Sequence, residues 1–147
     1  ARGDLGSYDL DAIVARVRAV VTEGVREVWL SSEDTGAYGR DIGRSLPELL
    51  RAVIAALPDG VMLRIGMTNP PYVREHVEAV AEALRHPRVY KFLHIPVQSG
   101  SSSVLASMRR EYTAAEFEEL ATGLLERVPG LTLATDVICG DPTETED

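Results

Sequence analysis

The stretch Ser31-Ser32-Glu33-Asp34-Thr35-Gly36-Ala37-Tyr38-Gly39-Arg40-Asp41-Ile42-Gly43 follows directly on an apolar run, residues 25–30. It places an adjacent pair of carboxylates, Glu33 and Asp34, and three glycines where a buried strand is expected to end. In parallel α/β folds, ligands are held at that end of the strands. The stretch therefore favours a parallel α/β fold with a binding site at the carboxyl edge of its sheet.

Three later strand candidates end in polar side chains in the same way. The first carries Arg64, the second runs from His94 into Gln98 and Ser99, and the third carries Asp136. Because the carboxyl ends of parallel strands meet at one edge of a sheet, we expect these side chains to converge on a common cavity.

The hydrophobic pattern alternates between helical and strand periods along the whole chain. Helices are predicted for residues 9–23, 46–57, 73–85, 101–109 and 113–127. Strands are predicted for residues 26–32, 61–68, 89–97 and 131–138. Ser7 or Asp9 is expected to cap the first helix, and Thr113 with Glu116 forms a capping box for the last. This order predicts four parallel strands joined by helical crossovers.

Each predicted strand has one aliphatic face and one mixed polar face. In the second strand, Leu63 and Ile65 share a face that opposes Arg64. An open, doubly wound sheet needs two apolar faces, so a barrel with a ligand in its lumen explains the pattern better. The same alternation turns Cys139 toward the helices and predicts a core position for it. Four parallel strands cannot close a barrel, so we expect this chain to be a segment of a larger protein.

The composition is that of a globular domain with an aliphatic core. The chain has 147 residues, of which 45% are hydrophobic, 26% charged and only 5% aromatic. No apolar run approaches the ~20 residues that cross a bilayer, so no membrane contact is expected from this segment. The single cysteine excludes an internal disulfide and favours a cytoplasmic location. A net charge of −8 argues against this segment alone holding nucleic acid.

Several stretches resemble the central part of the radical S-adenosylmethionine methylthiotransferases. The matching stretches are residues 1–3, 29–43, 63–71, 94–99, 108–112 and 134–140. The longest, at residues 29–43, is specific, whereas each later stretch is weak by itself. The branch that acts on threonylcarbamoyladenosine in tRNA, in its eukaryotic and archaeal form, is the most similar one.

The resemblance implies a fold and a reaction. The fold is a partial, TIM-like (β/α)6 barrel, of which residues 1–147 would form an incomplete radical S-adenosylmethionine core domain. A 4Fe-4S cluster would reductively cleave S-adenosylmethionine to a 5′-deoxyadenosyl radical. A methylthio group would then be installed at C2 of N6-threonylcarbamoyladenosine, at position 37 of tRNA. A second cluster in an N-terminal domain and a C-terminal RNA-binding domain complete the family architecture.

The chain departs from the family at the cluster. The family holds its radical-generating cluster with three cysteines in a loop that would precede Ala1, whereas this chain contains only Cys139. One thiolate cannot hold a 4Fe-4S cluster, so we expect the cluster ligands outside this chain and the segment alone to be inactive. The sulfur source and the electron donor are left open. Eukaryotic relatives can carry a membrane tail, so tethering to the endoplasmic reticulum through such a tail is an alternative to a free cytoplasmic location.

The candidate site residues are assigned to S-adenosylmethionine by charge and shape. Glu33 would bind the amino group of the methionine moiety, the alternative being an ordinary loop carboxylate. Arg64 would bind the methionine carboxylate, because a guanidinium on the lumen face needs an anion. Its alternative is a structural ion pair with Glu33 or Asp136.

The remaining candidates lie at the ends of the last two strands. Gln98 and Ser99 would bind ribose hydroxyls or the carboxylate, or would satisfy the backbone of their own turn. Asp136 is either a ligand contact or a buried hydrogen-bonding anchor, and Ile138 would lie beside the adenine. His94 is interpreted as a satisfied core histidine. No catalytic or metal-binding residue is assigned.

Two other functions stay open. The first is a sister methylthiotransferase that acts on isopentenyladenosine in tRNA or on a ribosomal protein. The second is a non-catalytic barrel remnant that serves as a binding module.

Overall fold

The computed structural model describes residues 5–145, so the resembling stretch at residues 1–3 lies outside the described part. The order of elements is α1 (Leu10–Thr22), β1 (Glu27–Leu30), η1 (Thr35–Ala37), α2 (Leu46–Ala56), β2 (Met62–Ile65), α3 (Pro70–Glu75), α4 (Val77–Arg85), β3 (Phe92–His94), α5 (Ser102–Ser107), α6 (Ala114–Arg127) and β4 (Thr132–Ala134). The predicted alternation of helices and strands is confirmed.

Local signals set the ends of the longest helices. The Asp9 side chain accepts hydrogen bonds from the amides of Asp11 and Ala12, at 2.9 and 3.3 Å, and thereby caps α1. Helix α6 begins with the predicted capping box of Thr113 and Glu116. These caps satisfy amides that the first turn of a helix leaves without partners.

The helix predicted for residues 73–85 is wrong in its bounds. The structure has two helices here, α3 and α4, separated by His76, whose φ of −132° and ψ of 25° leave the helical region. Helix α3 starts at Pro70, earlier than predicted, because proline has a helix-compatible φ and needs no amide partner in the first turn.

Within residues 5–145, all strand pairings are parallel. In the first pair Glu27 lies opposite Met62, and in the second Phe92 lies opposite Thr132. A bridge between Leu63 and Val89 joins the two pairs. The spatial order is therefore β1-β2-β3-β4, the same as the order along the chain, as expected for part of a TIM-like barrel.

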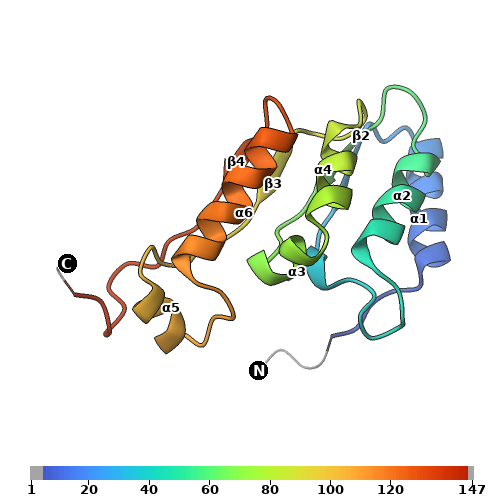
Figure 1. Ribbon diagram of the computed structural model, residues 1–147. Coiled ribbons are helices and arrows are strands. Elements are labelled where there is room, and N and C mark those ends of the chain that lie inside the picture. The colour runs from blue at the N-terminus through green and yellow to red at the C-terminus, as the bar shows by residue number, and fades with distance from the viewer. Residues whose placement is uncertain (1–4, 146–147) are drawn as a thin grey trace.

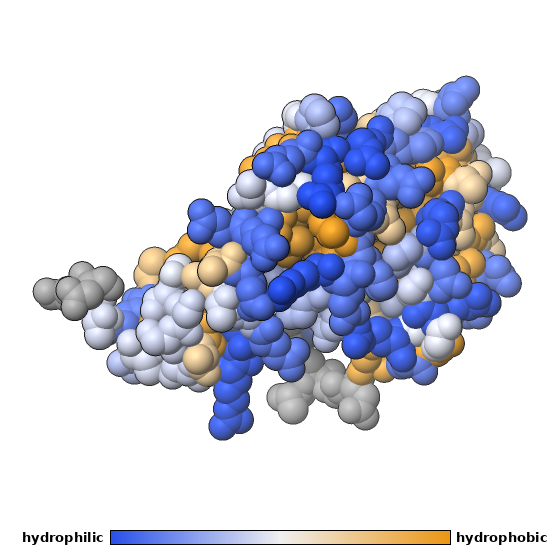
Figure 2. Space-filling view, in the orientation of Figure 1, coloured by the Kyte–Doolittle hydropathy of each residue, from blue (hydrophilic) through white to orange (hydrophobic). Residues whose placement is uncertain are grey.

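The helices form a single layer. Figure 1 shows α1, α2, α4 and α6 on the same side of the strands. Fully buried aliphatic side chains fill the space between the helices and the strands; among them are Val53, Leu63, Ile65, Leu84, Leu93 and Leu124. A doubly wound sheet would carry helices on both sides, so the structure agrees with the predicted barrel segment. Figure 2 shows that the helix side is mostly hydrophilic, with a small apolar patch near its middle.

The core position predicted for Cys139 is wrong, because this cysteine is exposed. Strand β4 ends at Ala134, five residues before the cysteine, so the strand alternation no longer applies there. Among residues 5–145, no helix combines the length and the apolar character that crossing a bilayer requires.

Candidate functional site

The site lies on the side of the strands that the helices leave uncovered, which we call the open face; in β1–β3 it carries Trp29, Arg64, Phe92 and His94. Arg64 is half-buried in the middle of β2, and its neighbours Leu63 and Ile65 point into the core. Because side chains alternate along a strand, Arg64 points the other way. This placement agrees with the predicted lumen face.

Two aromatic rings enclose Arg64. Its Cζ lies 4.4 Å from the centre of the Trp29 ring and 4.6 Å from the centre of the Phe92 ring. Trp29 is the register partner of Arg64 on β1, and Phe92 lies on β3. Within residues 5–145 the Arg64 side chain makes no hydrogen bond or ion pair, so the alternative of a structural ion pair with Glu33 or Asp136 is not found. Its N–H groups therefore have no protein acceptor in the described part of the chain.

The ring of Trp29 is held from the side. Its indole N–H donates to Glu27 Oε1, and the Tyr90 hydroxyl donates to Glu27 Oε2 at 3.2 Å. Burial, together with the Glu27 carboxylate, raises the pKa of Tyr90 above its ordinary value, so the phenol keeps its proton and remains a donor. Trp29 itself is 61% exposed. The indole plane is thus fixed although one side of the ring faces solvent.

His94 and Asp136 form a second contact on the open face. His94 Nε2 lies 2.8 Å from Asp136 Oδ2. Asp136 is interpreted from the sequence either as a ligand contact or as a buried hydrogen-bonding anchor. Its bond to His94 fits the anchor, but the carboxylate is exposed and not buried. His94 is half-buried and satisfied by this bond, although it faces away from the core.

The backbone brings three of the predicted residues together. The Gln98 amide donates to the Asp136 carbonyl at 2.9 Å, and the Gln98 carbonyl accepts from the Ile138 amide at 2.8 Å. Gln98 has a φ of +69°, which is uncommon for a residue other than glycine and recurs at functional sites. Ile138 is 42% exposed and offers an apolar surface beside these groups.

Glu33 and Ser99 are placed differently. Glu33 is exposed and lies in the loop that follows β1, at the carboxyl edge. Ser99 is buried, and its hydroxyl accepts a hydrogen bond from the Ser101 amide at 3.1 Å. Ser99 thus satisfies the backbone of its own turn, which is the alternative to ligand binding given above. A ligand role for either residue stays a prediction.

The sequence did not predict that Asp34 links two loops. Asp34 Oδ2 accepts from Asn69 Nδ2 at 2.6 Å, and Oδ1 accepts from the amides of Asn69 and Gly36 at 3.2 and 3.0 Å. The carboxylate therefore ties the loop after β1 to the loop between β2 and α3. The available signal was the Asp-Thr-Gly turn in one loop and the Asn-Pro-Pro turn in the next, both of which are typical of side-chain to backbone bonding.

The close approach of these loops demands a glycine. A Cβ on Gly36 would lie 2.1 Å from Thr68 Oγ1 and 2.8 Å from the Cβ of Tyr72. Gly36 thus lets the loop after β1 lie against the end of β2 and the start of α3.

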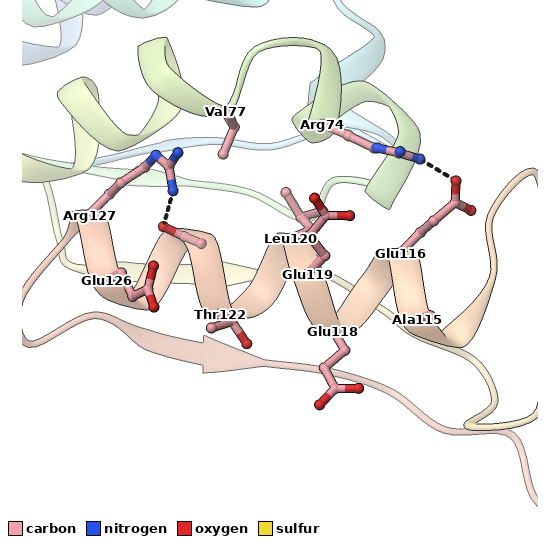
Figure 3. Close-up of a pocket in the computed structure, with 11 residues that line it drawn as sticks. Arg74, Val77, Ala115, Glu116, Glu118, Glu119, Leu120, Thr122, Glu126 and Arg127 are labelled. Carbon is pink, nitrogen blue, oxygen red and sulfur yellow. Dashed lines mark hydrogen bonds and ion pairs between the residues drawn. The ribbon is translucent and has the colours of Figure 1, made fainter.

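A separate groove of about 560 Å³ lies on the helix side, between α3, α4 and α6. Figure 3 shows its ends: Arg74 pairs with Glu116 at 2.5 Å, and Arg127 donates to the Gly123 carbonyl at 2.9 Å. None of the sequence-predicted site residues lines this groove. A smaller pocket of about 260 Å³ lies at the carboxyl end of β1, where Trp29, Ser31, Ser32 and Asp34 contribute to its lining.

The two implied cofactors fit these residues unequally. A 4Fe-4S cluster does not fit, because the chain has one cysteine and residues 5–145 hold no cluster of three or more metal-ligating side chains. S-adenosylmethionine fits better, because a guanidinium without an acceptor faces the open side and matches a carboxylate.

Comparison with known proteins agrees with this geometry. The Radical SAM superfamily profile matches residues 1–147. The chain is 63% identical to the threonylcarbamoyladenosine tRNA methylthiotransferase of Drosophila melanogaster, over 100% of the chain and 27% of the relative. Identity is 59% to the human protein of that name (99% and 25% covered) and 44% to a probable one from Pyrococcus abyssi (100% and 34% covered).

The chain therefore spans between a quarter and about a third of the length of these relatives. The profile, in contrast, covers every residue of the chain, and the parallel strands under one helix layer are consistent with it. The chain belongs to the radical S-adenosylmethionine superfamily.

Proposed function

We propose that this chain is the cosubstrate-binding part of a radical S-adenosylmethionine methylthiotransferase that modifies threonylcarbamoyladenosine in tRNA. The names of its relatives, at 56–63% identity in animals, support the reaction and the substrate. The observation that carries the proposal is Arg64, a half-buried guanidinium on the open face with no acceptor in the described chain.

Arg64 binds the carboxylate of the methionine moiety. A guanidinium presents parallel N–H groups that match the two oxygens of a carboxylate. The flanking rings, whose centres lie 4.4 and 4.6 Å from Arg64 Cζ, shield the guanidinium from water in part, which strengthens a bond made at its edge. Glu33, in the loop after the neighbouring strand, supplies a negative charge for the methionine ammonium group.

The carboxyl ends of the last two strands hold the nucleoside half. The Gln98 side chain and the exposed Asp136 carboxylate offer an amide and an acceptor to the ribose hydroxyls. Ile138 provides an apolar contact for the adenine. Ser99 acts through its turn, in which its hydroxyl accepts a hydrogen bond from the Ser101 amide directly after Gln98.

The remaining functions belong to other parts of the full-length protein. Reductive cleavage of S-adenosylmethionine supplies the radical, and it requires a cluster whose cysteines this chain does not contain. Because this segment has a net charge of −8, other regions of the full-length protein bind most of the tRNA phosphates. Its own residues bind and orient the cosubstrate.

The first test measures cosubstrate binding. Full-length protein carrying Arg64→Ala, with its clusters reconstituted, should bind S-adenosylmethionine at least about tenfold more weakly, because a charge-assisted pair is lost. Its cluster absorbance should be unchanged. Arg51→Ala, which removes an exposed arginine from the outer side of α2, is the matched control and should bind normally. Normal affinity of the Arg64→Ala protein in calorimetry would contradict the carboxylate role.

The second test identifies the substrate. Mass spectrometry of tRNA nucleosides from cells that lack the full-length protein should show that methylthio-threonylcarbamoyladenosine has disappeared, and the wild-type protein should restore it. An unchanged level of this nucleoside would refute the proposal. Loss of the methylthio group from isopentenyladenosine or from a ribosomal protein instead would identify a sister enzyme.

A further inference from the structure

We infer that Trp29 and Phe92 are positioning residues that clamp the Arg64 guanidinium so that only its edge is available to the cosubstrate carboxylate. The inference rests on the proposed function, because it concerns how Arg64 is presented to its ligand. It assigns a role to two aromatic side chains that the charge-based argument does not use.

Trp29 and Phe92 approach Arg64 from both neighbouring strands. The two rings belong to the strands on either side of β2, and their centres lie 4.4 and 4.6 Å from Arg64 Cζ. Distances this short place the cation within the range of a strong cation–π contact, which extends to about 6 Å. With a ring on each of two sides, the guanidinium has little freedom to rotate out of its place.

Glu27 holds the Trp29 ring of the clamp in place. Glu27 accepts from the Trp29 indole and from the Tyr90 hydroxyl, one at each carboxylate oxygen. A tryptophan that is 61% exposed would otherwise adopt other rotamers in water. The Glu27 bond therefore orders the ring that in turn orders Arg64.

The clamp does not use the hydrogen-bond donors of Arg64. The two rings compensate the positive charge without using a hydrogen-bond acceptor, so every N–H of Arg64 stays available for a ligand. An ion pair with a protein carboxylate would have occupied these donors. Arg64 is ordered before the ligand arrives, so binding does not have to immobilise a long flexible side chain.

The test compares two ligands on the full-length protein with reconstituted clusters. Calorimetry is performed with S-adenosylmethionine and with its decarboxylated analogue, for Trp29→Leu, Phe92→Leu and Trp29→Phe. We expect each leucine variant to bind S-adenosylmethionine about three- to tenfold more weakly, and Trp29→Phe to stay within about twofold of wild type. The affinity for the decarboxylated analogue should be the same in all of them.

The control removes another pair of the same type. Tyr72→Leu deletes the ring that lies 5.1 Å from Arg40 Cζ, and it should leave both affinities unchanged. In the Arg64→Ala background, Trp29→Leu should have no further effect, because the two side chains act as one unit.

The outcomes separate this inference from the function on which it rests. If Arg64→Ala binds normally, the proposed carboxylate role fails, and the clamp fails with it. If Arg64→Ala weakens binding and both leucine variants bind like wild type, the clamp alone is refuted. Equal weakening of both ligands in the leucine variants also refutes it, because that result indicates general damage to the fold.

Discussion

Replacement of Asp34 by alanine should release the loop after β1 from the loop between β2 and α3. The carboxylate holds Asn69 through two hydrogen bonds, at 2.6 and 3.2 Å, and holds Gly36 through a third at 3.0 Å. Thr68 adds a long contact of 3.5 Å. Alanine removes all four and leaves two backbone amides without their acceptor.

The magnitude follows from the two amide bonds. A hydrogen bond to a charged group contributes a net ~1.5–3 kcal/mol. Asp34 is half-buried, so we use the lower value for each amide and count neither the Asn69 side chain, which can turn to water, nor the long Thr68 contact. The local opening free energy should then fall by about 3 kcal/mol, which is about a hundredfold in the equilibrium constant.

Amide hydrogen exchange followed by mass spectrometry measures this opening in the full-length protein. Peptides that contain Gly36 or Asn69 should exchange about a hundredfold faster in Asp34→Ala. Asp34→Asn is the matched control: its side-chain oxygen can still accept from both amides, so exchange should accelerate much less. If Asp34→Ala exchanges at the wild-type rate in both peptides, the carboxylate does not tie the two loops.

Three further predictions concern stability. Tyr112→Phe removes a buried hydroxyl that bonds two backbone carbonyls at 3.2 and 3.3 Å, so it should destabilise the protein by about 1–3 kcal/mol and lower the melting temperature in calorimetry. Gly36→Ala should destabilise by a similar ~1–3 kcal/mol, because the added Cβ meets Thr68 at 2.1 Å; an unchanged melting temperature would show that the loop can move. Hydrogen bonds from Thr113 lower the pKa of Glu116, so the ionised carboxylate stabilises the folded protein above its ordinary pKa of about 4.3, and this stabilisation is lost as the pH falls through the pKa in the folded protein. The free energies of unfolding of Glu116→Gln and wild type, measured by denaturation, should therefore differ at pH 6 and converge toward pH 3. A difference that is the same at both pH values would contradict this.

Helix ends were largely predictable because they depend on local chemistry. The Asp9 cap and the capping box at Thr113 need only residues within one turn, and both are present as predicted. The break at His76 could not be predicted in this way. A helical pattern runs through both α3 and α4, and no local signal in it marks His76, whose backbone leaves the helical region in the structure.

Strand lengths were less predictable, because a strand needs a partner as well as a pattern. The pattern of residues 131–138 extends past β4, but only Thr132–Ala134 pair regularly with β3. Beyond Ala134 the side chains lose the helix layer, and Cys139 is exposed for that reason. An alternating pattern therefore indicates which way residues would face, and not whether a neighbouring element covers them.

In the candidate site, too, features set by local sequence were predictable and features set by neighbouring strands were not. Alternation alone placed Arg64 on the open face, and the sequence pattern placed Gln98 and Asp136 at neighbouring strand ends, which the structure joins through the backbone. The aromatic neighbours of Arg64 were not predicted. Their contact depends on the spatial order of the strands and on a register that pairs position 29 with position 64.

The spatial order of the strands also explains why the N–H groups of Arg64 remain available to a ligand. The protein groups nearest to it along the sheet are rings, whereas the exposed carboxylate of Asp136 lies beyond β4 and is already bonded to His94. A charged group that is half-buried without an acceptor is costly unless something compensates it. The two rings compensate the cation in part, and a carboxylate at its free edge would complete the compensation. The arrangement is stable without a ligand and better satisfied with one, which is the property that a binding group requires.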